Sequence, residues 1–294
     1  MATQRGQMAQ LLAAGLQEVM FEWLKEHPEE YSQFLKVETS DSAYDEDQIF
    51  AGLGLARKKP EGTPITYDDP IQGGSKRYIH DSYALGWQVT KEMLDDDKYA
   101  LMKQIPGELM KSCRQAWEQV GANVLNLGFS TVTTADGATV FNAAHPMLGG
   151  GTYSNLVAED MGVTALQDIL ILFEYMVNER GLKMRLEPAD LWIPPDLQFT
   201  TGEILQSAYK PYTGSNEINV MQGRLTPAVL HFVTSTTAWF VSSGDEANRL
   251  KFKWRAKPVT DATDDFETKG TKHSIYFRIS AGATDWRGWV GSNP

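Results

Sequence analysis

The amino-acid sequence predicts an α+β fold built around one long helix. Three observations lead to this prediction. A helical stretch covers residues 95–129, an extended two-stranded excursion precedes it over residues 52–90, and strands with alternating polarity return after residue 250. Alternation with a period of two indicates strands, and apolar residues spaced three or four apart indicate a helix. The strands near the C-terminus are therefore expected to pack on the long helix.

The stretch from Asp95 to Phe129 shows the helical pattern clearly. Its apolar stripe comprises Leu109, Cys113, Ala116, Trp117, Val120, Val124 and Leu127. Lys111, Arg114, Glu118 and Asn123 lie off this stripe. Asp95, Asp96 and Asp97 are suited to capping the N-terminus and to complementing the helix dipole, and Gly128 is a natural stop. Pro106 and Gly107 are expected to kink or break the helix near its first third.

Residues 52–88 read as an extended loop. Residues 65–69 and 76–80 are predicted to be its two strands, around Gln72-Gly73-Gly74-Ser75. A hairpin with so little apolar content is marginal in water, so it needs another surface on its own chain or on a neighbour. Its basic side chains complement an acidic chain. The alternative is a solvated flexible loop with ordinary surface charges. The candidate inter-subunit contact residues are Arg57, Lys58, Lys59, Tyr67, Lys76, Arg77 and Tyr78.

The N-terminal segment differs in character from the rest. Residues 7–26 predict an amphipathic helix, and residues 29–50 are polar and acidic, with a few anchors such as Phe34, Leu35 and Phe50. We therefore interpret residues 1–51 as an N-terminal arm rather than a part of the core.

The second half of the chain alternates between helix and strand signals. Thr164 and Gln167 form a capping-box pattern for a helix that should end at Gly181. Short strands are expected at 191–193, 229–233 and 238–241, with a short helix near 201–208. Residues 250–255 alternate, which directs Leu250, Phe252 and Trp254 inward and Lys251, Lys253 and Arg255 outward. Residues 256–272 read as a polar loop before a last strand with Ile275, Phe277 and Ile279 inside.

Composition excludes several classes of protein. The 294 residues are 42% hydrophobic and carry a net charge of −11, which argues against gripping nucleic acid through a basic face. The single cysteine, Cys113, cannot form an intrachain disulfide and is expected to be buried. We see no signal peptide and no apolar run long enough to span a bilayer. The protein is expected to be made in the cytoplasm and to stay soluble or assemble there.

No catalytic constellation is evident. The five histidines show no metal-binding spacing, and neither a phosphate-binding loop nor a nucleophile elbow is present. We therefore predict no catalytic, cofactor-binding or metal-binding residues. His145 in Ala-Ala-His-Pro is interpreted as a turn histidine with a hydrogen-bonded ring. The alternative is a hydrolase that uses His145 with Asp136 or Asp285. Asp285-Trp286-Arg287 indicates an ion pair beside an aromatic ring.

The order of these parts resembles the Hong Kong 97-type fold of tailed-phage major capsid proteins, and more narrowly the major head subunits of Mu-like phages. The likeness covers roughly residues 50–294. The motifs that carry it are Tyr83–Glu92, Asp95–Tyr99, Leu125–Phe129, Asp136–Gly137 with Phe141 and His145–Pro146, Gly149–Gly150 with Ser154–Leu156, Leu191 with Pro194–Leu197, Asn219–Val220, Ala238–Phe240, and Arg278 with Gly282–Gly288 and Gly291–Ser292.

The resemblance implies a division into parts. Residues 1–51 would be the arm and 52–88 the extended loop that lies across a neighbouring subunit. Residues 89–135 and 236–294 would form the peripheral domain with the spine helix, and residues 136–235 the axial domain.

The resemblance also implies a function. The chain would be a non-enzymatic shell protein of the virion, assembling with itself into hexamers and pentamers of an icosahedral head around double-stranded DNA. Scaffolding, portal and decoration proteins are the expected partners, without cofactors or membrane contact. Some members of the fold crosslink their subunits through a lysine and an asparagine, but no such triad aligns in this sequence, so no crosslink is predicted. The remaining alternative of the same fold is an encapsulin-like shell of a cellular nanocompartment.

Overall fold

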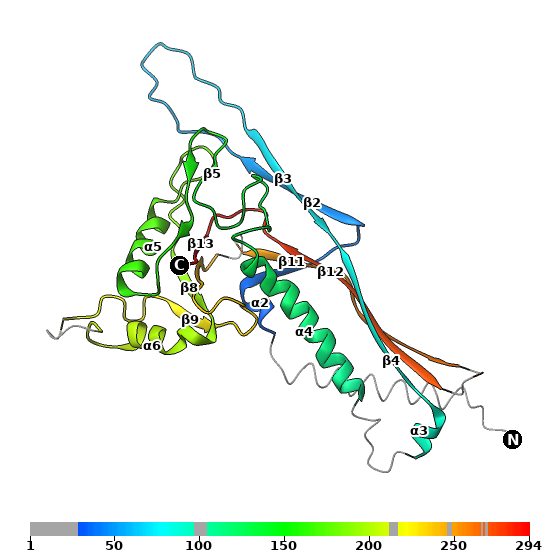
Figure 1. Ribbon diagram of the computed structural model, residues 1–294. Helices are drawn as coiled ribbons and strands as arrows, with labels where there is room; N and C mark the ends of the chain where they lie inside the picture. The colour runs from blue at the N-terminus through cyan, green and yellow to red at the C-terminus, as the bar shows by residue number, and fades with distance from the viewer. Residues whose placement is uncertain (1–28, 97–104, 212–216, 246–248, 266, 268–269) are drawn as a thin grey trace.

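Two β-sheets and one long helix organise the molecule (Figure 1). The computed structural model describes residues 29–96, 105–211, 217–245, 249–265, 267 and 270–294. The helix predicted over residues 7–26 lies outside the described residues.

The first sheet has the strand order β1-β11-β12-β4. Its strands are β1 (Leu35–Thr39), β11 (Leu250–Asp264), β12 (Thr271–Gly282) and β4 (Asp81–Val89). β1 runs parallel to β11, and the other two pairings are antiparallel. Leu250, Phe252, Trp254, Ile275, Phe277 and Ile279 are all buried, which confirms their predicted orientation. The expected polar loop is much shorter than predicted, because β11 and β12 continue their ladder as far as Asp264 and Thr271.

Helix α4 (Ile105–Asn126) lies along this sheet (Figure 1). Trp117 meets Trp254 and Phe277 edge-on, with ring centroids 5.5 and 5.4 Å away. α4 begins at Ile105, next to Pro106, which agrees with the predicted break in the helical run, whereas the alternative, a kink inside the helix, is not formed. Pro106 lies in the first turn of α4, where the missing N–H would have had no helical partner in any case. The expected aspartate cap is also not formed, because Asp95 ends a separate short helix, α3 (Lys91–Asp95).

The second sheet has the order β7-β13-β10-β8-β9. Its strands are β7 (Leu156–Val157), β13 (Trp289–Ser292), β10 (Trp239–Ser243), β8 (Pro188–Ile193) and β9 (Thr226–Val229). Successive side chains point to opposite faces of a strand. Trp192, Phe240 and Trp289 join the core around α4, whereas their neighbours Leu191, Ile193, Trp239, Val241 and Val290 join a second core. The sheet is thus a wall shared by two cores.

The second core is covered by α5 (Val163–Tyr175), the 3₁₀ turn η2 (Pro195–Leu197) and α6 (Gln198–Gln206). The predicted capping box does not form. Gly162 occupies the N-cap position of α5 without a side-chain hydrogen bond, and the helix ends at Tyr175, before Gly181. Gly181 instead has a positive φ of 79° in the turn that follows.

The extended excursion is a two-stranded ribbon, but its strands are not the predicted pair. β2 (Tyr44–Ala51) pairs antiparallel with β3 (Ile71–Ile79), and residues 52–70 form an irregular loop between them. The prediction of a strand at residues 65–69 is wrong. Pro64 and Pro70 flank that segment, and proline cannot donate to a strand ladder. Two further short strands, β5 (His145–Pro146) and β6 (Thr152–Tyr153), pair with each other.

The interpretation of residues 29–50 as an arm outside the core is wrong for residues 31–39. Helix α2 (Tyr31–Phe34) and β1 bury Tyr31, Phe34 and Leu35 in the first core. Glu118 explains part of this placement. It is buried in α4, and its carboxylate accepts the backbone N–H groups of Glu30 and Tyr31 at 3.1 and 2.9 Å. A glutamate off the apolar stripe therefore anchors the N-terminal segment.

Candidate assembly surface

The ribbon and its loop expose many apolar side chains. Tyr67 is 88% exposed and Phe50 is 70% exposed. Exposed apolar residues of the same segment are Tyr44, Leu53, Leu55, Ile65 and Ile79. Figure 1 shows this segment extending away from the two sheets. Large apolar side chains left exposed on one projecting segment favour an interaction surface over an ordinary solvated loop.

The base of the ribbon is fixed to the first sheet by a charge cluster. Asp47 of β2 lies 2.7 Å from Lys251 Nζ and 3.1 Å from Lys253 Nζ. Burial alone would raise the pKa of Asp47, but the two lysines and their hydrogen bonds lower it below its usual range. Lys253, predicted to point to solvent, is buried because the ribbon covers this face of the sheet.

His80 lies at the junction between β3 and β4, with its side chain fully buried. Its Nδ1 is 3.0 Å from Ser280 Oγ, and its Nε2 is 3.6 Å from Asp45 Oδ2. Burial lowers the pKa of His80, the Asp45 carboxylate opposes that shift, and the nearby cations Arg278, Lys253 and Arg255 reinforce it. The junction therefore favours a neutral imidazole.

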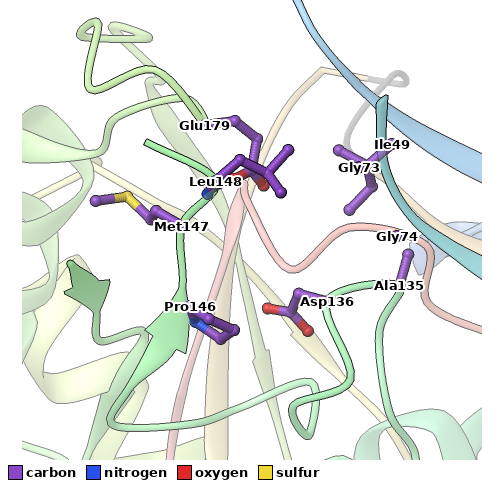
Figure 2. A pocket seen from close by; sticks show the side chains of 9 residues that line it. All are labelled: Ile49, Gly73, Gly74, Ala135, Asp136, Pro146, Met147, Leu148 and Glu179. Atoms are coloured by element: carbon purple, nitrogen blue, oxygen red, sulfur yellow. Dashed lines mark hydrogen bonds between the residues drawn. The ribbon is translucent and has the colours of Figure 1, made fainter. Parts of the chain in front are cut away.

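A cleft separates the middle of the ribbon from the body. Its volume is about 240 Å³. Figure 2 shows the residues that line it, which are Ile49, Gly73 and Gly74 from the ribbon and Ala135, Asp136, Pro146, Met147, Leu148 and Glu179 from the body. A Cβ on Gly74 would lie 1.9 Å from the Ala135 carbonyl oxygen. Glycine is therefore required at this contact between the ribbon and the body.

His145 is a buried structural residue. Its Nδ1 lies 2.7 Å from Asp136 Oδ2, its Nε2 lies 2.9 Å from Asn155 Oδ1, and its ring stacks on Trp286 at 4.4 Å. The side chain is 0% exposed. A general base must reach a proton of the substrate, and both ring nitrogens here are occupied by side chains of the same chain. The geometry supports the turn interpretation and not the hydrolase alternative.

Asp136 and Asp285 also have structural partners. Burial alone would raise the pKa of Asp136, but hydrogen bonds from His145, Thr134 and the Ala138 backbone N–H lower it. Asp285 lies 3.0 Å from Arg287 Nη1, and that guanidinium lies 4.5 Å from the centre of the Trp286 ring. The predicted ion pair beside an aromatic ring is confirmed.

The candidate contact residues occupy different environments. Arg57, Lys58, Lys59 and Tyr67 are exposed on the irregular loop. Arg77 is also exposed and lies 3.6 Å from Glu46. Lys76 is half-buried and donates to Thr133 Oγ1 at 3.2 Å, and burial lowers its pKa.

Tyr78 differs from the other candidates because the structure places it inside the subunit. Its hydroxyl lies 2.7 Å from Thr284 Oγ1, and burial raises its pKa. Tyr78 thus helps to hold the ribbon base to its own chain.

Sequence reasoning missed the lysine–aspartate cluster, His80 and Arg180, whose contacts all join segments far apart in the chain. Within the part of the chain that the structure describes, no group of acidic, histidine or cysteine side chains is arranged to hold a metal ion. Among the described residues no helix is long and apolar enough to cross a membrane.

A spine helix on one sheet, a second sheet shared by two cores and a projecting ribbon define a shell-forming subunit of the Hong Kong 97-like fold. The chain belongs to the phage capsid protein family, whose model matches residues 75–292. It is a structural protein of the virion shell, a major capsid protein, and not an enzyme. The narrower resemblance to Mu-like head subunits stays a prediction.

Solved capsid structures share the fold at low sequence identity. The chain from Microbacterium phage Oxtober96 is 8% identical, with a TM-score of 0.60 and 91% of each chain covered. The procapsid chain of bacteriophage JBD30 is 14% identical, with a TM-score of 0.57, and the match covers 99% of this chain and 76% of that one. The capsid chain of a native GTA particle is 11% identical, with a TM-score of 0.62, covering 89% and 88%. No curated protein sequence matches the chain.

Proposed function

We propose that the subunits form hexamers and pentamers of an icosahedral head around double-stranded DNA, with the ribbon and loop of each subunit lying across the next. The observation that carries this proposal is the exposed apolar surface of residues 44–79, with Tyr67 88% exposed at the loop. Contact of one surface with a different surface of the next copy closes a ring when the rotation allows it. The ribbon and loop thus act as the overlapping element.

Charge supports the same arrangement. Arg57, Lys58 and Lys59 are exposed on the loop, whereas the whole chain has a net charge of −11. A basic loop approaching an acidic neighbour gains from complementary potentials, which favour correct docking over incorrect docking. The acidic balance also suits a shell that encloses DNA without binding it tightly.

We propose the domain division implied by the resemblance, with its bounds changed where the fold differs. Residues 44–79 act as the projecting ribbon and loop, residues 31–39, 81–135 and 236–294 as the peripheral domain, and residues 136–235 as the axial domain at the capsomer centre. The two apolar cores support a peripheral and an axial part.

Further partners are proposed from the family. Scaffolding and portal proteins would act during assembly in the host cytoplasm. A decoration protein is supported by the JBD30 capsid, which is described as decorated with minor capsid protein trimers.

The test compares two double variants in the same loop. Leu55→Ser with Tyr67→Ser removes exposed apolar contacts, whereas Glu61→Ser with Thr66→Ser changes exposed polar residues as the matched control. We expect the first to abolish shells in electron micrographs while leaving the folded subunit intact, and the control to assemble. Wild-type protein that stays a monomer with and without its scaffolding protein would contradict the proposal. An encapsulin-like role would instead be indicated by shells that enclose an enzyme cargo.

A further inference from the structure

Arg180 joins the body of the subunit to the neck of the irregular loop, where its two ends, near Gly52 and Asp69, leave the ribbon. Its Nε donates to the Gly52 carbonyl oxygen at 3.1 Å. Its Nη2 donates to the Asp69 carbonyl oxygen at 2.5 Å and lies 3.3 Å from Asp68 Oδ1. Gly52 is the first residue of the irregular loop, and Asp69 is the last but one. One guanidinium therefore bonds both ends at once.

Asp68 completes this closure from the loop side. Its Oδ2 accepts the Gly54 backbone N–H at 2.7 Å, while its Oδ1 faces Arg180. The Gly54 hydrogen bond lowers the pKa of Asp68, slight desolvation opposes that shift and Arg180 reinforces the lowering. The side chain is therefore a carboxylate at neutral pH. The planar guanidinium fork suits several simultaneous acceptors, which the point charge of a lysine does not.

The turn that carries Arg180 is held without the Arg180 side chain. Asn178 Oδ1 accepts the backbone N–H groups of Arg180 and Leu182, each at 2.9 Å. The neighbouring Glu179 accepts the Leu148 N–H at 2.9 Å and lies 2.8 Å from the buried Arg287 Nη1. The turn is thus anchored to the core, so truncation of Arg180 should leave it in place.

The irregular loop is held less firmly than the strands of the ribbon. The base of the ribbon is fixed by Asp47 and the two lysines, and its middle meets the body at Gly74, beside the cleft of Figure 2. Residues 52–70 have no strand ladder of their own, so their direction depends on contacts at the two ends of the loop. Arg180 supplies such a contact.

We propose that Arg180 is a latch that sets the direction of the extended loop in the free subunit, so that a second copy meets a preorganised loop. This inference rests on the proposed function, in which the loop lies across the next copy. A loop that is already ordered pays less conformational entropy on docking. Arg180 acts as a positioning residue, because it orients the loop and leaves the exposed contact residues free for the partner.

The test measures the loop in the unassembled full chain. Hydrogen–deuterium exchange is followed over residues 52–70 in the wild type, Arg180→Ala, Asp68→Ala and Arg180→Lys. The matched control is Arg224→Ala, which removes the same charge from an exposed position. We expect exchange of the Gly54 amide to rise about tenfold in both alanine variants, less in Arg180→Lys and not in the control. Shell yield should fall in the same order.

Exchange over residues 52–70 that is the same in all four variants as in the wild type would overturn the latch. Because exchange is read before assembly, this outcome is distinct from failure of the proposed function, in which the wild type itself forms no shells. Faster exchange with normal shell yield would also overturn the proposal, because the loop direction would then not matter for docking. A thermal melt that matches the wild type checks that each variant is folded.

Discussion

Two histidines make carboxylate contacts of almost equal length in opposite surroundings. The Nδ1 atom of His145 lies 2.7 Å from the Asp136 carboxylate, and that of His231 lies 2.6 Å from the Glu30 carboxylate. The side chain of His145 is 0% exposed, whereas that of His231 is 67% exposed. Judged by distance alone, the two pairs would contribute equally to folding stability. Burial separates them, because an exposed pair is weakened by solvent and a buried group left without its partner costs much more.

We therefore expect His145→Ala to lower the free energy of unfolding by roughly 2–4 kcal/mol, because it leaves Asp136 and Asn155 without a buried partner and opens a gap beside Trp286. The matched control, His231→Ala, should cost roughly 0–1 kcal/mol. Urea denaturation of the unassembled chain measures both. Equal losses in the two variants would contradict the structural role assigned to His145.

The lowered pKa of His80 predicts that folding stability depends on pH. Its pKa is lowered in the folded state, chiefly by burial. As the pH falls below the ordinary value of 6.5, the unfolded chain takes up the proton first, so stability falls with acid. His273 has a lowered pKa for the same main reason and adds to the effect. Asp47, whose pKa is also lowered, adds a further loss only at pH values below its ordinary 3.8.

We expect the free energy of unfolding of the wild type to decrease between about pH 7.5 and about pH 5.5. His80→Gln should reduce this slope, and the double variant with His273→Gln should reduce it further. Urea denaturation across that range provides the measurement. A slope that is unchanged by both substitutions would show that neither ring carries the pH dependence.

At the scale of single residues, the sequence indicated a hydrogen-bonded ring at His145 and named Asp136 as a possible partner, but it did not indicate Asn155. Ala-Ala-His-Pro indicates a turn with a hydrogen-bonded ring, and the structure confirms it. Asp136 and Asn155 become its partners through the packing of the Asp-Gly turn and β6 nearby. Arg180 carried no signal, because its contacts lie more than 100 residues away in sequence.

At the scale of elements, the strands at the cores and a two-stranded excursion were predicted, but β2 as one strand of that ribbon was not. Residues 250–255 and 275–279 alternate because one face packs on α4. β2 contains Asp45, Glu46 and Asp47, which read as a polar arm in isolation. Two of these acidic residues face Lys253 of the first sheet. The lysine that compensates the charge of these carboxylates lies far away in the sequence, so the local pattern of residues 44–51 could not reveal the pairing.

The close approach of β3 to the body gives a prediction for this element. Gly74→Ala would place a Cβ 1.9 Å from the Ala135 carbonyl oxygen, so the ribbon must move. We expect a loss of roughly 1–3 kcal/mol in the free energy of unfolding and fewer shells. The control is Gly202→Ala in α6, where nothing lies within 4 Å of the added Cβ. That variant should be neutral or stabilised by roughly 0.5–1 kcal/mol. Normal stability and assembly of Gly74→Ala would argue against a fixed ribbon.

At the scale of the whole molecule, the shared sheet couples the two cores. β8, β10 and β13 each send one side chain to the first core, namely Trp192, Phe240 and Trp289, and their neighbours to the second. Loss of either core would expose one face of the same sheet to solvent. The resemblance implied a peripheral and an axial part, but the sequence did not show that one sheet lies between the two cores, because the alternation of short strands does not identify what covers each face.

This coupling predicts one unfolding transition for the described body of the subunit. Phe277→Leu alters the first core and Ile169→Ala alters the second, at side chains that are 1% and 0% exposed. Because both cores hold the same strands, each substitution should lower the temperature of a single calorimetric peak, with Ile169→Ala costing roughly 2–5 kcal/mol. Differential scanning calorimetry of the unassembled chain measures this, since contacts between subunits would add stability of their own. Two peaks that respond separately to the two substitutions would mean that the axial part unfolds independently, and the sheet would then not act as a shared wall.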